Sequence, residues 1–194
     1  CLFEDESLTP KFSKTIQDLD IVVGIRQLTK IAFLIEGALL TEKETITKLS
    51  FQGDYSFLAK ELNAKLNFGH LVIPEFNPYL KVLPLSIASG TIESGAFQLQ
   101  FKDNLISLKG VMSTKELGLR KEGLALTGDI DIEPDLRYAI DKKTLDYQAN
   151  IKFINVNLNG LQYINKINNI SGDVGLIKNK LWTDNLKLQA LDTT

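Results

Sequence analysis

The stretch Glu61-Leu62-Asn63-Ala64-Lys65-Leu66-Asn67-Phe68 alternates strictly, with an apolar side chain at every even position and a polar one at every odd position. Successive side chains of a β-strand point to opposite faces, so this period of two predicts a strand with one apolar and one polar face. The same alternation recurs through most of the 194 residues. The sequence therefore predicts a mainly β protein built from one continuous, mostly antiparallel sheet.

Other runs follow the same pattern with different lengths. Beyond 61–68, strands are predicted at 15–23, 30–40, 45–57, 92–102, 105–117, 124–132, 145–153, 174–182 and 185–191. The apolar phase slips by one residue at Phe153-Ile154 and continues at Val156 and Leu158. A single extra residue in one strand produces such a slip, so the sequence predicts a β-bulge at this point.

Two segments break the alternation. Apolar residues fall at helical spacing at about 74–84 and again at 159–167, and both runs are too short to form independent helices. We expect each to lie as a plug or lid against the apolar side of the sheet. Both lead into a Ser-Gly pair that opens a strand, at Ser89-Gly90 and Ser171-Gly172. This internal repeat predicts that 1–194 is a single domain and a fragment of a longer repetitive β protein.

Glycines occupy the apolar phase of several strands, where a buried side chain is expected. A glycine on the inward face usually marks a tight bend or a close approach of two backbones. The predicted sheet-bend glycines are Gly37, Gly53, Gly90, Gly110, Gly128 and Gly172. Their common phase predicts long strands bent into a strongly curved, U-shaped sheet whose concave side is an apolar groove. The predicted groove lining is Ile35, Leu49, Phe51, Leu62, Ala64, Leu66, Phe68, Phe97, Leu99, Phe101, Leu108, Leu126, Ile130, Ala149, Ile151 and Phe153.

The composition excludes several classes of protein. Hydrophobic residues make up 44% of the chain and charged residues 24%, which is typical of a folded domain. The net charge is −2 without a basic stripe, so nucleic acid is not an expected partner. The longest apolar run, 31–40, is interrupted by Glu36 and is far shorter than the ~20 residues of a membrane span. Cys1 is the only cysteine, and two readings of it stay open: an acylated lipoprotein N-terminus, or a cut from a longer chain, which we favour.

Catalytic residues are scarce. His70 is the only histidine, no phosphate-binding loop or nucleophile elbow occurs, and Ser89 and Ser171 have no base in a common motif. An acidic ladder alternates with isoleucines over 129–135 and is predicted to be a solvated strand face rather than a calcium site. We therefore predict no enzyme activity, no cofactor and no metal site. A hydrolase that uses His70 is the least favoured alternative.

The repeated motif carries a resemblance. Residues 161–174 form a short amphipathic segment followed by an Ile-x-x-Ile-Ser-Gly-polar-Val turn, and 179–186 add a second strand after a tight turn. Residues 79–92 carry a looser version, and 49–55 and 124–132 show a strand-Gly-Asp-strand pattern. Over about two-thirds of its length the chain resembles the AsmA-like family, the bacterial envelope proteins that include TamB and belong to the repeating-β-groove lipid-transfer proteins.

This resemblance implies a function and a place. It implies that phospholipid chains lie in an apolar β-groove and cross the periplasm between membranes, in support of outer-membrane lipid homeostasis or assembly. It also implies a tether to the inner membrane through a segment that this sequence does not contain. A second hypothesis stays open: a structural or assembly module of the envelope that binds protein partners through its sheet edges.

Overall fold

The computed structural model describes residues 1–7, 12–40, 46–81, 84–161, 166–178 and 180–191. Its elements, in chain order, are β1 (Leu2–Asp5), β2 (Phe12–Gln27), β3 (Lys30–Leu40), β4 (Ile46–Ser56), β5 (Glu61–Val72), the 3₁₀-helix η1 (Ile73–Phe76), α1 (Asn77–Leu80), β6 (Ser86–Lys102), β7 (Leu105–Lys121), β8 (Leu124–Ala139), β9 (Thr144–Asn159), β10 (Lys166–Ile177), β11 (Lys180–Trp182) and β12 (Lys187–Leu191).

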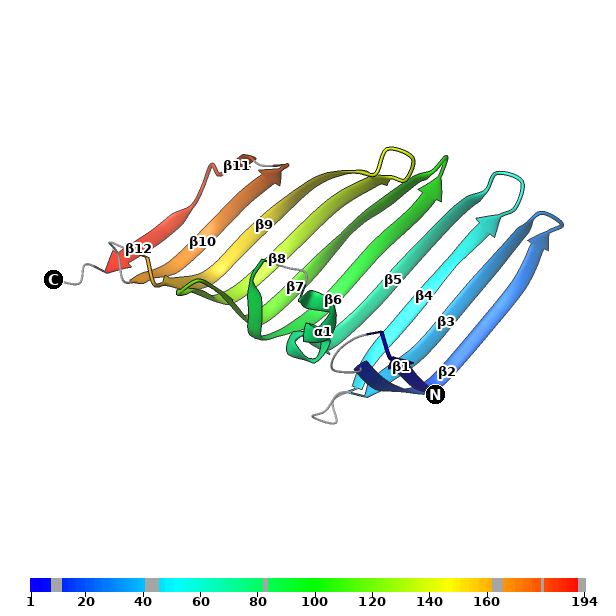
Figure 1. Ribbon diagram of the computed structural model, residues 1–194, viewed down its shortest axis with the longest axis horizontal. Coiled ribbons are helices and arrows are strands. Elements are labelled where there is room, and N and C mark those ends of the chain that lie inside the picture. The colour runs from blue at the N-terminus through cyan, green and yellow to red at the C-terminus, as the bar shows by residue number, and fades with distance from the viewer. Residues whose placement is uncertain (8–11, 41–45, 82–83, 162–165, 179, 192–194) are drawn as a thin grey trace.

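The strands lie side by side in a single open sheet (Figure 1). From β1 to β11 they follow one another in chain order, each pairing is antiparallel, and β12 pairs with β10. The prediction of one mainly β, antiparallel sheet is confirmed. The predicted strand at 174–182 is wrong, because β10 ends at Ile177 and the chain turns back at Lys180 to form β11 against it. The sequence also gave no sign of β1.

The strand register brings the apolar positions into line. Directly paired residues of neighbouring antiparallel strands have their side chains on the same face. One such row crosses β2 to β9 through Val23, Phe33, Gly53, Ala64, Leu99, Leu108, Leu136 and Tyr147. The alternation within each strand therefore adds up to one face of the sheet that is apolar over many strands. We call it the apolar face, and the opposite one the polar face.

A line of irregular residues crosses the sheet nearer to the helices. Asp18, His70, Glu116, Asn155 and Asn169 have positive φ angles between 48° and 53°. Shifts of register accompany four of them, in β2, β7, β9 and β10. Such bulges bend a strand and increase its twist. The bulge predicted from the phase slip in 153–158 is confirmed and lies at Asn155; we call the whole set the bulge line.

The helical connection between β5 and β6 lies at one end of the sheet (Figure 1). Pro74 and Pro78 stand in the first turns of η1 and α1, where a missing N–H costs little. The helix predicted at 74–84 is confirmed as far as Leu80. The helix predicted at 159–167 is wrong at its two ends, because Asn159 closes β9 and Lys166 opens β10, whereas 162–165 lie outside the described residues. Of the helices described, none has the length and apolarity to cross a membrane.

Candidate functional site

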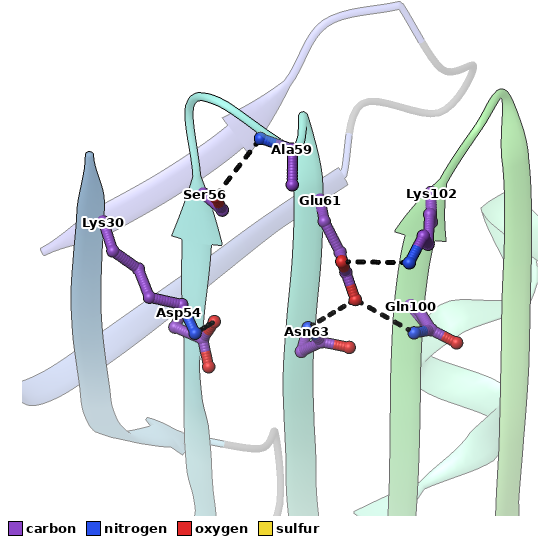
Figure 2. Close-up of polar contacts among 8 residues, drawn as sticks. All are labelled: Lys30, Asp54, Ser56, Ala59, Glu61, Asn63, Gln100 and Lys102. Atoms are coloured by element: carbon purple, nitrogen blue, oxygen red, sulfur yellow. Dashed lines mark hydrogen bonds and ion pairs between the residues drawn. The ribbon is translucent and has the colours of Figure 1, made fainter.

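The polar face is held by ion pairs and amide hydrogen bonds between neighbouring strands. Lys30 Nζ lies 2.9 Å from Asp54 Oδ1, and Glu61 accepts hydrogen bonds from Asn63 and Gln100 at 3.1 and 3.3 Å (Figure 2). The bond from Asn63 is the main reason why the pKa of Glu61 lies below its ordinary value. Except for Glu61–Asn63, each contact joins residues of adjacent strands. These solvent-accessible contacts on the polar face therefore help to fix the register of the strands.

One end of the apolar face is covered, and we call it the closed end. Its buried side chains are Ile73, Ile92, Leu117, Ile130, Val156 and Ile170. Val156 is 0% and Ile130 4% exposed, so this cluster is dry. Ile73 from η1 and Leu80 from α1 pack on it. The expectation that the first helical segment covers the apolar sheet is met here.

The first part of β2 holds η1 and α1 in place. The Phe12 ring packs against Phe76 and Tyr79, with centroids 5.4 and 4.9 Å apart. Lys14 forms an ion pair with Glu75, and the two side chains are only 7% and 6% exposed. A buried ion pair specifies position more than it adds stability, because both charges lose their hydration. The helices are therefore fixed to the sheet rather than loosely placed over it.

Side chains of neighbouring strands satisfy the backbone groups that the bulge line leaves unpaired. Ser89 Oγ donates to the carbonyl of Glu116 at 2.9 Å, and Asp129 accepts from the N–H of Glu116 at 2.9 Å. The hydroxyl of Ser171 accepts from the N–H of Asn155 at 3.2 Å. The repeated Ser-Gly and Gly-Asp pairs are thus bulge partners, which gives the internal repeat a physical meaning and accounts for both serines.

Two buried threonines also donate hydrogen bonds to backbone carbonyl groups of neighbouring strands. Thr47 is 0% exposed and donates to the carbonyl of His70 at 2.7 Å. Thr114 is 3% exposed and donates to the carbonyl of Ile130 at 2.8 Å. Burial of a hydroxyl is tolerated only when it is hydrogen-bonded, and both are. His70 itself has a positive φ angle and an exposed side chain.

The rest of the apolar face, toward the turns at 28–29, 57–60, 103–104 and 140–143, is the open end. Apart from η1 and α1 the described elements form a single layer, so side chains here are covered only by their neighbours in the sheet. Most are half-buried, and Leu145, Val23 and Ile25 are 54%, 62% and 78% exposed. Phe68 and Phe97 stack with centroids 5.9 Å apart at the boundary of the two ends.

The predicted groove residues fall on the apolar face, divided between its two ends. In or against the closed end lie Phe68, Leu126, Ile130, Ile151 and Phe153. The register places the others outside that cluster: Ile35, Leu49, Phe51, Leu62, Ala64, Leu66, Phe97, Leu99, Phe101, Leu108 and Ala149. The predicted lining does not include Ile92, Leu117, Val156 and Ile170, although the phase slip near Phe153 did place Val156 in the apolar phase.

The predicted sheet-bend glycines do lie where strands approach closely. A Cβ at Gly53 would stand 2.3 Å from the carbonyl oxygen of Asn63. At Gly128 it would stand 2.7 Å from the Cα of Val156, with a φ of 150° that L-residues rarely adopt. The nearest atom to such a Cβ lies on a neighbouring strand at 3.0 Å for Gly37, 3.1 Å for Gly90 and 2.4 Å for Gly110, and for Gly172 it is the carbonyl oxygen of Asn185, before β12, at 2.6 Å. A side chain at Gly53 or Gly128 would therefore force the backbones apart.

A hollow of about 960 Å³ crosses β2 to β6 on the polar face. Two rows of side chains form its walls: Val22, Leu34, Gln52, Lys65 and Gln98 on one side, and Gly24, Ala32, Asp54, Asn63 and Gln100 on the other. The glycine pattern predicted a hollow on the apolar face instead, and sequence reasoning missed this one. The small residues Gly24 and Ala32 at one end of it were the available signal.

Among the described residues, no group of His, Cys, Asp or Glu side chains has the arrangement to hold a metal ion. The acidic ladder is divided among separate partners: Asp135 lies 3.0 Å from Lys109, the main reason why the pKa of Asp135 is lowered, and Glu133 accepts from Asn150. Comparisons with protein-family models, with curated proteins and with solved structures gave no match.

Proposed function

We propose that the open end of the apolar face binds the acyl chains of phospholipids or other acyl lipids, and that the protein moves lipid rather than acting as an enzyme. The continuity of this face carries the proposal. The row from Val23 to Tyr147 is apolar or glycine at every strand it crosses, and its members are not covered by a second layer of described elements. Val23 is 62% exposed, Ala64 is buried and the other members are half-buried, and a contiguous apolar surface that stays partly open to solvent marks an interaction site.

The energetics favour a long aliphatic ligand. Burial of a methylene group contributes about 0.8 kcal/mol, so two acyl chains laid across several strands gain enough to offset the cost of immobilising them. A surface of similar apolar side chains contains no single deep site, which suits movement along it. Headgroups would stay in water beyond the strand ends, where charged residues such as Lys102 and Asp141 are exposed.

In this proposal the sheet is strongly curved, and the apolar face is the inside of a U-shaped groove that further repeats of a longer chain would extend. Bulges and glycines are the usual devices for such curvature, and both are present: Gly128 lies against Asn155 of the bulge line, and Gly53 and Gly110 lie between regularly paired strands. The resemblance to AsmA-like proteins supports a setting in the periplasm, tethered to the inner membrane by a segment outside this sequence, with a role in outer-membrane lipid homeostasis or assembly.

The test is lipid carried by the purified protein, measured by mass spectrometry after expression in a lipid-rich bacterial host. Leu99→Glu puts a charge on the open end and should remove co-purifying phospholipid. Gln98→Glu introduces the same charge one residue away on the polar face and should leave the lipid in place. Leu66→Glu is expected to act like Leu99→Glu, whereas Ile151→Asp also disturbs the closed end, since Ile151 packs against it.

Protein that is reproducibly free of lipid would overturn the proposal, as would equal loss in Leu99→Glu and Gln98→Glu. Circular dichroism of each variant separates loss of the ligand from loss of the fold.

A second candidate function, binding of a protein partner through a sheet edge, is favoured by one observation. The outer edge of β2 is paired with β1 only over Phe12–Thr15. An unpaired edge of this length can accept an added strand.

A further inference from the structure

The outer edge of β2 has an open stretch that begins next to β1. The carbonyl of Cys1 accepts the N–H of Ile16, and β1 extends no further along β2. Among the described residues no strand pairs with the outer edge of 18–27. Its backbone N–H and C=O groups on that side can therefore pair with another strand.

Charges, proline and β-bulges usually protect edge strands from pairing. In this stretch the bulge at Asp18 and the charges of Asp20 and Arg26 lie toward the ends, and the centre has none of these features. Here the centre is Ile21-Val22-Val23-Gly24-Ile25, and the four large side chains are 56%, 52%, 62% and 78% exposed, on both faces of the sheet. The exposed area is therefore a strip along the edge, and an added strand would cover it on both faces.

The stretch is complementary to itself when it is turned antiparallel about Val23. In that register Asp20 lies opposite Arg26 of the second strand, Ile21 opposite Ile25, Val22 opposite Gly24, and Val23 opposite itself. Opposite charges across a pair of strands stabilise it, and the twofold symmetry forms this pair twice. The charges flank an apolar centre, so this register forms ion pairs at its ends and apolar contacts in its middle.

Two details of the free edge fit this partner. Asp20 lies directly opposite Glu36 of β3, an unfavourable pairing of like charges that an incoming arginine would relieve. A Cβ at Gly24 would have no atom within 4 Å, so there is open space beside the position where the second copy's valine would lie. Asp20 and Gly24 share one face of β2, because they are four residues apart, and Arg26 lines the same hollow as Gly24.

We propose that a second copy of this chain pairs with the outer edge of β2, antiparallel and centred on Val23, to form a symmetric dimer with one continuous sheet. The symmetry axis is perpendicular to the sheet, so the apolar faces of the two copies lie on the same side and form one surface. This inference rests on the second candidate function, edge binding, and is independent of acyl-chain binding.

Charge exchange tests the register. In sedimentation equilibrium at about 100 µM protein, Asp20→Arg should raise the dimer dissociation constant at least about tenfold, because arginine would face Arg26. The double variant Asp20→Arg with Arg26→Asp should restore dimerisation to about the original level. Asp20→Arg should fold normally, since it places a positive charge opposite Glu36. A monomeric wild-type chain, or a double variant no better than the single one, would overturn the proposal.

Cysteine pairing tests the centre, in a chain whose Cys1 is replaced by serine. Directly opposite residues have Cα atoms about 4.5–5.5 Å apart, which suits a disulfide. Val23→Cys should therefore form a covalent dimer under mild oxidation. Val22 is similarly exposed, but in this register it faces Gly24 of the second copy, and the two copies of residue 22 are offset by two residues along the strands. Val22→Cys should therefore cross-link at least about tenfold more slowly. Equal rates would rule out this register. Asp20→Arg changes a side chain on the polar face, so unchanged lipid content in that variant would show that a failure here leaves the acyl-chain proposal standing.

Discussion

The two ends of the apolar face have the same sequence pattern and different environments. At the closed end, Leu117 and Ile130 are 5% and 4% exposed, in the cluster that also contains Ile73 of η1 and contacts Leu80 of α1. At the open end, Leu145 in the same alternating phase is 54% exposed. Period-two alternation specifies which face is apolar, but what covers that face depends on distant segments. The comparison indicates that stability resides mainly in the closed end and leaves the open end available for a ligand.

The bulge line is what separates the two ends. On its helical side whole side chains are buried, and the bulges at Glu116 and Asn155 are satisfied by side chains of neighbouring strands. On the other side most apolar side chains are half-buried or exposed. The bulges are thus part of the structure that closes one end of the sheet.

The largest expected difference between the ends comes from truncation of leucine. Leu117→Ala should lower the free energy of unfolding by about 2–5 kcal/mol, because it leaves a cavity in a packed cluster. Leu145→Ala removes the same atoms from an exposed position and should change it by less than about 0.5 kcal/mol. Urea denaturation measures both, and equal effects would contradict the division into a closed and an open end.

Replacement of glycine by alanine tests whether the close approach of two strands requires glycine. Gly128→Ala should cost about 1–3 kcal/mol, since alanine would adopt a strained φ and press on the backbone of Val156. Gly24→Ala is the matched control: open space surrounds its Cβ position, so the change should be neutral or slightly stabilising. Thermal melting of the two variants compares them directly, and a loss from Gly24→Ala as large as that from Gly128→Ala would count against the argument.

A buried hydroxyl gives a smaller effect. Thr114→Val keeps the shape of the side chain and removes the donor to the carbonyl of Ile130, with an expected loss of about 1–2 kcal/mol. Thr127→Val alters an exposed threonine on β8 and should be almost neutral. Should Thr114→Val be as stable as the wild type, the hydrogen bond would not contribute to closure.

The smallest effect concerns the contact between β1 and α1. Hydrogen bonds from Ser7 and then from Tyr79 lower the pKa of Asp5, so its contribution to stability is present above the unfolded value of about 3.9 and lost as pH falls through the folded pKa. Tyr79→Phe should move the pKa of Asp5 toward its ordinary value without abolishing the shift, since Ser7 remains. NMR titration of the Asp5 carboxyl measures this, and an unchanged pKa would exclude the contact in solution.

Local patterns predicted much of the fold. The alternation in 61–68, the phase slip near Phe153 and the helical spacing of apolar residues in 74–84 each reflect a rule that acts within a few residues, and the structure contains the strand, the bulge and the helix. The turn that ends β10 at Ile177 was missed, because 174–182 alternates well enough to read as one strand.

Contacts between strands were the part that the sequence could not supply. Asp129 reads as one member of an exposed acidic ladder, yet its carboxylate accepts the N–H of Glu116, which a bulge in β7 turns toward it. The hollow on the polar face depends likewise on five strands aligned in register. Register is a tertiary property, so Gln52 and Gln98 could not be brought together from their spacing.

The central claim is that acyl chains lie on the open end of the apolar face. A phospholipid with a photoreactive diazirine in its acyl chain, cross-linked to the protein and mapped by mass spectrometry, tests this most directly. We expect adducts on open-end residues such as Leu99, Phe101 and Leu108 and far fewer on polar-face neighbours such as Gln98 and Gln100. Adducts spread equally over both faces, or concentrated in the polar hollow, would contradict the account.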